Sequence, residues 1–281
     1  MNGINENNHY KLIVSDVDET LLDSKMHLGD FSVNVLRTLQ ERGLQMTLAT
    51  GKSYYAVNDL IHLLGINMPM VFFNGGMVQD ADGKILFSQT LKKEIVLKIL
   101  EICNRQNADF LIQYPDRIYI SEINSNTNFS MQYNEPAPTV IKDLLGKMGV
   151  LEDPPKVMVV NFDHPEALPL LRDELINVLG DQTNITFSLP TMLEIMPVGI
   201  SKSFGVRFIT GKLGIPLEQV IAFGDGDNDA EMLRDVGLGV AVENASPLCK
   251  SSANMIVGSN EDQGPAAFLN DFYSLGFEKP A

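Results

Sequence analysis

Hydrophobic runs of strand length alternate with segments of helical periodicity along residues 11–76. The runs KLIVS, LQMTLA and MPMVFF predict strands, and the spacing of apolar residues predicts helices at 30–42 and 54–64. This alternation is typical of parallel strands joined by right-handed crossover helices. Polar residues close each run, so we expect the strands to end at one polar edge of a sheet.

The pattern changes at residues 80–84, where DADGK predicts a hairpin turn and the crossover order is lost. An α+β segment is expected after it, in the order helix 92–106, strands 110–113 and 117–121, helix 140–148, strand 156–162, helix 165–179 and strands near Ile185 and Leu193. Crossover order then returns with helix 202–213, the strand QVIAF, helix 229–236 and strands 238–242 and 255–257.

The predicted fold is therefore α/β, with a Rossmann-like doubly wound parallel sheet as its core and an inserted α+β cap domain. Residues 1–84 and 194–281 are expected to form the core, or catalytic, domain, and residues 85–193 the cap. A length of 281 residues is enough for two domains that each bury a hydrophobic core. We expect the cap to cover the polar edge, exclude water and select the substrate.

The charge balance excludes nucleic acid as an expected partner. The chain has 36 Asp and Glu against 21 Lys and Arg, a formal net charge of -15, and such a field repels polyanions. The same field disfavours a phosphate ester. A phosphate site in this chain therefore needs a metal ion and a local cation that reverse the sign nearby.

Cysteine usage and hydropathy predict a cytoplasmic protein without a membrane partner. Cys103 and Cys249 lack metal-ligand spacing and are expected to be reduced thiols. The start, MNGINENNHY, lacks the basic flank and apolar segment of a signal peptide. The longest apolar stretch, 60–73, is too short to span a bilayer and is interrupted by His62, Gly65, Asn67 and Pro69. Both a monomer and a homodimer remain open.

The residues at the predicted strand ends suggest one shared site. They are Asp16, Asp18, Thr50, Gly51, Lys52, Asn74, Gly75, Gly224, Asp225, Asn228 and Asp229. Adjacent strands would bring four carboxylates together, and clustered carboxylates repel one another unless a cation holds them. Oxygen ligands of this kind favour Mg²⁺.

Two simpler explanations of these residues are a calcium-binding loop and a set of unrelated turns and helix caps. DGDNDAEML resembles the start of a calcium-binding EF-hand loop, but Ala230 and Val236 occupy positions that need Gly and Glu. Each strand-end motif alone is also more often a turn or helix cap, and Lys202 alone is typical of an exposed helix start. Their joint occurrence at matching strand ends favours a site.

Four segments, DVDETLL, ATGKS, GISKSFGV and GDGDNDAEML, resemble in order and spacing the motifs of the haloacid dehalogenase (HAD) superfamily of phosphatases. The insert between the second and third segments resembles the cap of the Cof-type sugar-phosphatase branch, and the C-terminal tail is similar to that branch as well. The resemblance implies a Mg²⁺-dependent phosphatase that hydrolyses a small phosphorylated metabolite through an aspartyl-phosphate. A sugar phosphate is the first expected substrate and a cofactor monophosphate the second.

The resemblance also implies a role for each matching residue. Asp16 would be the nucleophile and Asp18 the general acid and base. The metal ion would be held by Asp16, the Asp18 backbone carbonyl and Asp225, with Asp229 orienting its water shell. Phosphate binding is expected from Thr50, Gly51, Lys202 and Asn228, and substrate binding from Asn74 and Gly75.

Three positions depart from the pattern of the branch. Glu19 replaces a usual glycine, Lys52 a usual arginine, and Val242-Glu243-Asn244 a Met-Gly-Asn stretch. The Glu19 carboxylate either weakens substrate binding or points away from the site, and Lys52 cannot make the two-point anion contact of an arginine. Two alternatives stay open: a phosphomutase with the same aspartyl-phosphate chemistry, and a catalytically weak phospholigand-binding regulatory protein.

Overall fold

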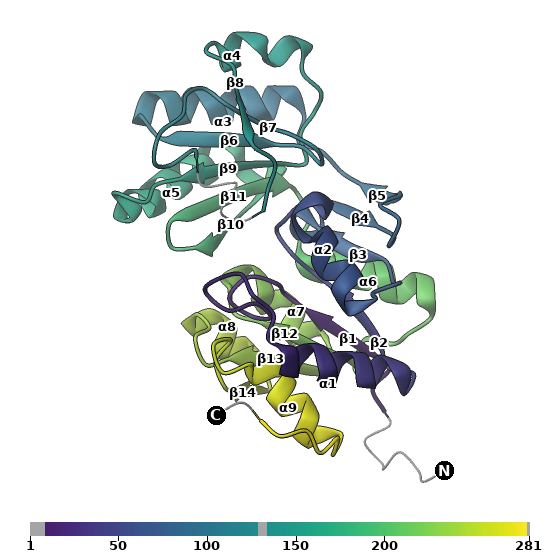
Figure 1. The fold of residues 1–281 in the computed structure, drawn as a ribbon. Helices are drawn as coiled ribbons and strands as arrows, with labels where there is room; N and C mark the ends of the chain where they lie inside the picture. Colours follow the sequence, from purple (N-terminus) through teal and green to yellow (C-terminus); the bar gives the residue numbers. More distant parts are fainter. Residues whose placement is uncertain (1–8, 129–133, 280–281) are drawn as a thin grey trace.

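The computed structural model describes residues 9–128 and 134–279. A parallel sheet of five strands, in the order β14-β13-β12-β1-β2, forms the centre of the core (Figure 1). Its strands are β1 (Leu12–Ser15), β2 (Gln45–Leu48), β12 (Val220–Gly224), β13 (Leu238–Val242) and β14 (Met255–Val257). The order places β1 beside both β2 and β12, so the chain winds outward from β1 in both directions.

Helices cover both faces of this sheet, as the doubly wound prediction requires. Alternation along β1 sends Ile13 toward one face and Leu12 and Val14 toward the other. The first face packs against α1 (Asp30–Glu41), α2 (Tyr54–Leu64) and α9 (Gly264–Phe272). The second packs against α6 (Lys202–Leu213), α7 (Ala230–Asp235) and α8 (Pro247–Ser252). The predicted core architecture is confirmed.

A small antiparallel sheet extends the core. It contains β3 (Met70–Phe72), β4 (Met77–Gln79) and β5 (Ile85–Ser88), and Val71 forms a parallel bridge with Ala49 next to β2. The predicted hairpin turn at 80–84 is present, since the Asp80 amide donates to the Lys84 carbonyl at 3.0 Å. Phe73–Gly75 forms a single 3-10 turn after β3.

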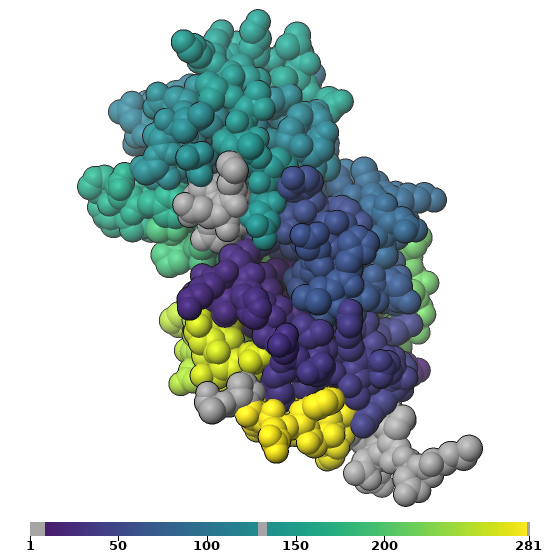
Figure 2. Space-filling view, in the orientation of Figure 1, coloured from purple at the N-terminus to yellow at the C-terminus, as the bar shows by residue number. Residues whose placement is uncertain are grey.

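The cap is a mixed sheet of six strands in the order β10-β11-β9-β6-β7-β8. These strands are β6 (Asp109–Gln113), β7 (Ile118–Ile120), β8 (Pro138–Val140), β9 (Lys156–Val160), β10 (Thr183–Leu189) and β11 (Met192–Pro197). Helices α3 (Lys93–Gln106) and α5 (Leu168–Leu179) pack on one face and close a separate hydrophobic core. In the space-filling view the teal cap meets the purple and blue core across the middle of the molecule (Figure 2).

Strand pairing places the crossings between cap and core slightly later than the expected boundaries. β5 pairs with β4 of the core, and β11 pairs with β9 and β10 of the cap. The crossings therefore follow Ser88 and Pro197, whereas the boundaries expected from the sequence follow residues 84 and 193.

The predicted helix at 140–148 is wrong over its first half. Val140 ends β8, which pairs in parallel with β7, and the α-helix covers only α4 (Leu144–Lys147). Pairing at the sheet edge overrides a helix-like apolar spacing here, and Gly146 and Gly149 weaken a longer helix. The short strand β8 and the C-terminal helices α8 and α9 were not predicted.

Two further expectations concern the cysteines and the membrane. Cys103 and Cys249 are both buried free thiols, as predicted. Within 9–128 and 134–279, no helix combines the length and the hydropathy needed to cross a bilayer.

Candidate active site

The candidate site lies where the winding of the parallel sheet reverses. Asp16 follows β1 and Asp225 follows β12, and these strands are neighbours, with the Asp16 amide donating to the Phe223 carbonyl at 3.0 Å. Ligands of open α/β sheets bind beyond the carboxyl ends of strands at such a switch point. The two carboxylates therefore approach each other because of topology, although they are far apart in the sequence.

Lys202 joins this pair from the start of α6. Ser201 caps the helix by accepting from the Phe204 amide at 3.1 Å, which fixes the direction of the next side chain. The Lys202 ammonium then donates to Asp16 Oδ1 at 2.6 Å and to Asp229 Oδ1 at 2.7 Å. Burial lowers the pKa of Lys202, but the adjacent carboxylates of Asp16 and Asp229 outweigh it and raise that pKa above its ordinary value.

Asp225 and Asp229 complete an acidic cluster with Asp16. Asp229 is fully buried, and its second oxygen accepts from the amides of Asp225 at 3.1 Å and Gly226 at 2.9 Å. Asp225 accepts from the Thr20 hydroxyl at 2.6 Å. Burial, opposed by Lys202, raises the pKa of Asp229 to about 6, and burial with the charges of Asp16 and Asp229 raises the pKa of Asp225 well above its ordinary value.

The donor set of this cluster fits a divalent cation. One oxygen from each of Asp16, Asp225 and Asp229 lies within 4.8 Å of the others. Lys202 is ion-paired with two of these three carboxyl groups, so the acidic groups outnumber the one cation that contacts them. Carboxylate oxygens with excess negative charge are the ligands that Mg²⁺ prefers.

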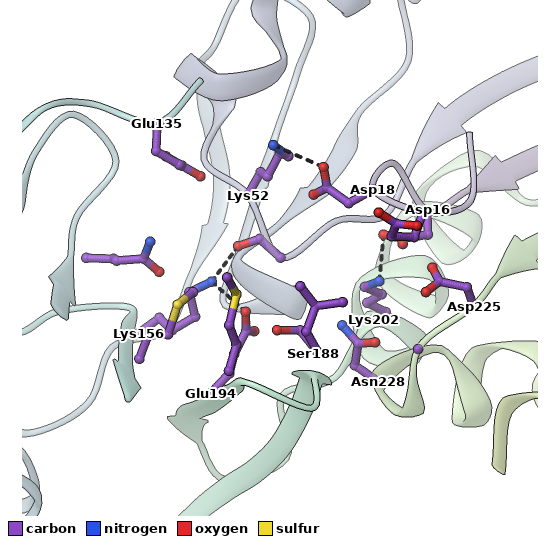
Figure 3. Close-up of a pocket in the computed structure, with 17 residues that line it drawn as sticks. Asp16, Asp18, Lys52, Glu135, Lys156, Ser188, Glu194, Lys202, Asp225 and Asn228 are labelled. Carbon is purple, nitrogen blue, oxygen red and sulfur yellow. Dashed lines mark hydrogen bonds and ion pairs between the residues drawn. The ribbon is translucent and has the colours of Figure 1, made fainter. Parts of the chain in front are cut away.

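Asp18 lies beside the cluster and is paired with Lys52. The Lys52 ammonium is 3.1 Å from Asp18 Oδ1, and Figure 3 shows the two side chains pointing toward each other. Burial raises the pKa of Asp18, while Lys52 opposes the shift. Lys52 therefore contacts a carboxylate of the protein itself.

A cavity between core and cap joins most of the predicted site residues. Those that line it are Asp16, Asp18, Gly51, Lys202, Asp225 and Asn228. Thr50 has no exposed surface, and its hydroxyl accepts from the Lys52 amide at 3.1 Å. Its position supports the conformation of the loop that presents Gly51.

Asn74 and Gly75, the two predicted substrate-binding residues, lie in the loop behind the cavity wall. Asn74 is buried, its amide donates to Glu194 of the cap, and its oxygen accepts from Asn228 at 3.1 Å. Gly75 has a φ of 101°, and a Cβ there would lie 2.1 Å from the Ser201 carbonyl oxygen. Glycine at this position allows close packing against the start of α6. Neither Asn74 nor Gly75 is in the cavity lining.

Glu19 also lines the cavity, and its backbone explains why glycine is usual there. Its φ of 54° lies in the left-handed region that favours glycine. The Asn244 amide donates to the Glu19 carbonyl at 2.7 Å, and the Asn260 amide is 3.4 Å from the Glu19 carboxylate. The side chain reaches toward Asn260 while the residue still lines the cavity, so both alternatives for the Glu19 carboxylate stay open.

The cap residues at the cavity were not predicted from the sequence. Gln113, Glu135, Lys156 and Glu194 all line it, and Glu135 accepts from the Ser53 amide at 2.9 Å and the Ser53 hydroxyl at 2.6 Å. A signal was present, because KVMVV and MLEIMP each carry one charged residue in an otherwise apolar strand.

The chain matches known phosphatases along almost its whole length. The family model of haloacid dehalogenase-like hydrolases covers residues 13–269. An HMP-PP phosphatase of Yersinia enterocolitica is 30% identical, over 94% of this chain and 96% of the relative. A 5-amino-6-(5-phospho-D-ribitylamino)uracil phosphatase of Bacillus subtilis is 28% identical, over 94% and 98% of the two chains.

A solved structure shows the same fold. A haloacid dehalogenase-like hydrolase from Bacteroides thetaiotaomicron superposes with a TM-score of 0.82 at 27% identity, over 93% of this chain and 99% of that one. The relatives are named as phosphatases, so the activity is that of a phosphoric monoester hydrolase. The chain belongs to the haloacid dehalogenase-like hydrolases, in their Cof-type branch.

Proposed function

We propose that this chain is a Mg²⁺-dependent phosphatase that hydrolyses a small phosphorylated metabolite through an aspartyl-phosphate on Asp16. The observation that carries the proposal is the ammonium of Lys202, held 2.6 Å from Asp16 and 2.7 Å from Asp229 at the switch point of the sheet. A buried cation beside a carboxylate nucleophile is what a dianionic phosphoryl group requires in a strongly acidic chain.

The reaction has two steps that use the same two carboxyl groups. In the first, an Asp16 oxygen attacks phosphorus, the ester P–O bond breaks, and Asp18 gives a proton to the leaving oxygen. In the second, Asp18 takes a proton from water, which attacks the acyl phosphate and releases inorganic phosphate and the Asp16 carboxylate. Asp18 is thereby returned to its protonated form.

The other site residues bind and orient the phosphoryl group. Lys202, Asn228 and Gly51 line the cavity, and we expect the Lys202 ammonium, the Asn228 side chain and the Gly51 amide to donate to the phosphoryl oxygens. Asp16, Asp225, Asp229 and the Asp18 carbonyl would hold the metal ion. When bound, Mg²⁺ supplies charge neutralisation between the nucleophile and the phosphoryl oxygens.

A sugar phosphate is the first proposed substrate, and a cofactor monophosphate is the second. One relative is named as a phosphatase of a phosphoribitylaminouracil, whose phosphate is attached to a polyol chain, and another as an HMP-PP phosphatase. Both names describe small phosphorylated metabolites, a class that a cavity enclosed by core and cap favours.

Phosphate release tests this function directly. We expect purified protein with Mg²⁺ to release phosphate from a panel of sugar, nucleotide and cofactor monophosphates, and a chelator to abolish release because the acidic cluster then lacks its cation. Release without a bisphosphate activator would contradict the phosphomutase alternative. No release from any ester at saturating Mg²⁺ would favour the phospholigand-binding alternative.

Asp18→Asn tests the proposed acid. We expect kcat/KM for an alkyl phosphate to fall by about 10²–10⁴-fold, because the alkoxide must leave with a proton. The loss should be much smaller for p-nitrophenyl phosphate, whose leaving group needs none. Measuring kcat/KM excludes the second step from the comparison, and an equal loss for both esters would refute the acid role.

A further inference from the structure

The face of the cap sheet that is turned to the cavity has polar residues at one end. Gln113 on β6, Lys156 on β9 and Glu194 on β11 line the cavity together with Met158 and Met192. Gln113 is the register partner of Lys156, and Glu194 is that of Met158, so the three polar side chains lie on neighbouring strands. Elsewhere this face contributes to an apolar cluster of the cap.

The ion pair between Lys156 and Glu194 is poorly explained by stability alone. Lys156 is 1% and Glu194 3% exposed, and their charged atoms are 3.2 Å apart. Desolvation of a buried pair offsets most of its attraction, so the attraction between the two charges adds little by itself to the stability of the cap sheet. Retaining both charges at a cavity wall favours a role in binding.

The same pair contacts the loops that hold the phosphate end of the site. Lys156 donates to the Gly51 carbonyl at 2.6 Å, and Glu194 accepts from the Asn74 amide. Asn74 in turn accepts from Asn228 at 3.1 Å. Figure 3 shows Lys156 and Glu194 on the opposite side of the pocket from Asp16 and Lys202, where the leaving group of a bound ester would lie.

Gln113 supplies an independent sign of a ligand. Its residue is 3% exposed, and its side-chain oxygen has no hydrogen-bond partner among the residues that the structure describes. A buried acceptor without a partner costs free energy, and a hydroxyl group of a ligand in this cavity would satisfy it.

We infer that Gln113, Lys156 and Glu194 form a subsite for the hydroxyl groups of an uncharged, polyhydroxylated leaving group. The inference rests on the proposed phosphatase function and specifies its substrate. A hydroxyl can donate to Gln113 or Glu194 and accept from Lys156. Lys156 and Glu194 are electrically balanced as a pair, so the subsite offers no net positive charge to a leaving group with a carboxylate or a second phosphate.

Three esters and one matched pair of variants test the subsite. Sorbitol 6-phosphate has a polyol leaving group, 3-phosphoglycerate an acidic one, and phenyl phosphate one without hydroxyl groups. We expect the wild-type protein with Mg²⁺ to prefer sorbitol 6-phosphate over 3-phosphoglycerate in kcat/KM. Gln113→Leu should lower kcat/KM for sorbitol 6-phosphate by about ten-fold or more, because one hydroxyl of the substrate loses its acceptor. For phenyl phosphate, kcat/KM should stay within about two-fold of the wild-type value.

Gln79→Leu is the control. Gln79 on β4 is also buried with an unpartnered side-chain oxygen, but it is outside the cavity lining, so all three esters should react as in the wild type. Melting temperature checks folding, and Gln113→Leu should not lower it. If it does, Gln113→Met, which keeps the length of the side chain and leaves the Lys156–Glu194 pair in place, is expected to show the same selective loss.

The outcomes separate this inference from the proposed function. Hydrolysis without preference among the esters, or equal losses for all three in both Gln113→Leu and Gln113→Met, would overturn the subsite and leave the phosphatase proposal intact. No Mg²⁺-dependent hydrolysis of any of the three esters would overturn both.

Discussion

Asp16→Asn is expected to lower kcat for phosphate release by at least about four orders of magnitude, because an amide cannot form the acyl phosphate. The fold should remain intact. Asn retains an oxygen that accepts from Lys202, and the change removes one negative charge from a cluster whose carboxylates lie within 4.8 Å of one another. Steady-state phosphate release and thermal unfolding, measured on the same preparation, check both parts.

Asp227→Asn is a matched control for this variant. Asp227 belongs to the same loop as Asp225, but it is exposed, accepts from the Ser246 hydroxyl at 2.6 Å and lies outside the cavity lining. Its activity should stay within about two-fold of the wild type, as for surface changes away from a site. Release that persists in Asp16→Asn at the wild-type rate would mean that another group is the nucleophile.

The core of the site could be predicted because its residues are tied to strand ends. Asp16 and Asp225 each follow a short apolar run, and parallel strands of a doubly wound sheet bring such positions to one edge. The role of Lys202 is less visible, since a lysine at a helix start is usually exposed. Only the packing of α6 against the sheet shows that this ammonium is buried between two carboxylates.

The cap half of the cavity could not be predicted in the same way. Gln113, Lys156 and Glu194 come from separate strands, and their proximity depends on antiparallel register, which alternation alone does not specify. Val140 shows a related failure, because its pairing with Ile120 at the sheet edge decides its conformation. Strand pairing between distant segments thus decides both the proximity of the cap residues and the conformation of Val140, and the local sequence pattern does not specify this pairing.

Lys202→Met is expected to have the largest effect on stability. Without the ammonium, Asp16 and Asp229 remain buried as uncompensated carboxylates, and breaking such a pair typically costs about 3–5 kcal/mol in the free energy of unfolding. Activity should also fall by about 10²–10³-fold, because the phosphoryl oxygens lose a charged donor. Chemical denaturation in the presence of a chelator measures the first effect, and phosphate release at saturating Mg²⁺ the second.

Mg²⁺ and a second substitution show whether the loss of stability in Lys202→Met is caused by uncompensated charge. Mg²⁺ should stabilise Lys202→Met more than the wild type, since a cation at the acidic cluster replaces part of the lost compensation. Adding Asp229→Asn to Lys202→Met should recover part of the lost free energy of unfolding, because one of the two unpaired carboxylates is gone. Lys212→Met, on the exposed side of the same helix, should change neither the free energy of unfolding nor the rate of phosphate release. Equal Mg²⁺ shifts in Lys202→Met and wild type, with no recovery in the double variant, would show that Lys202 stabilises the protein through packing alone.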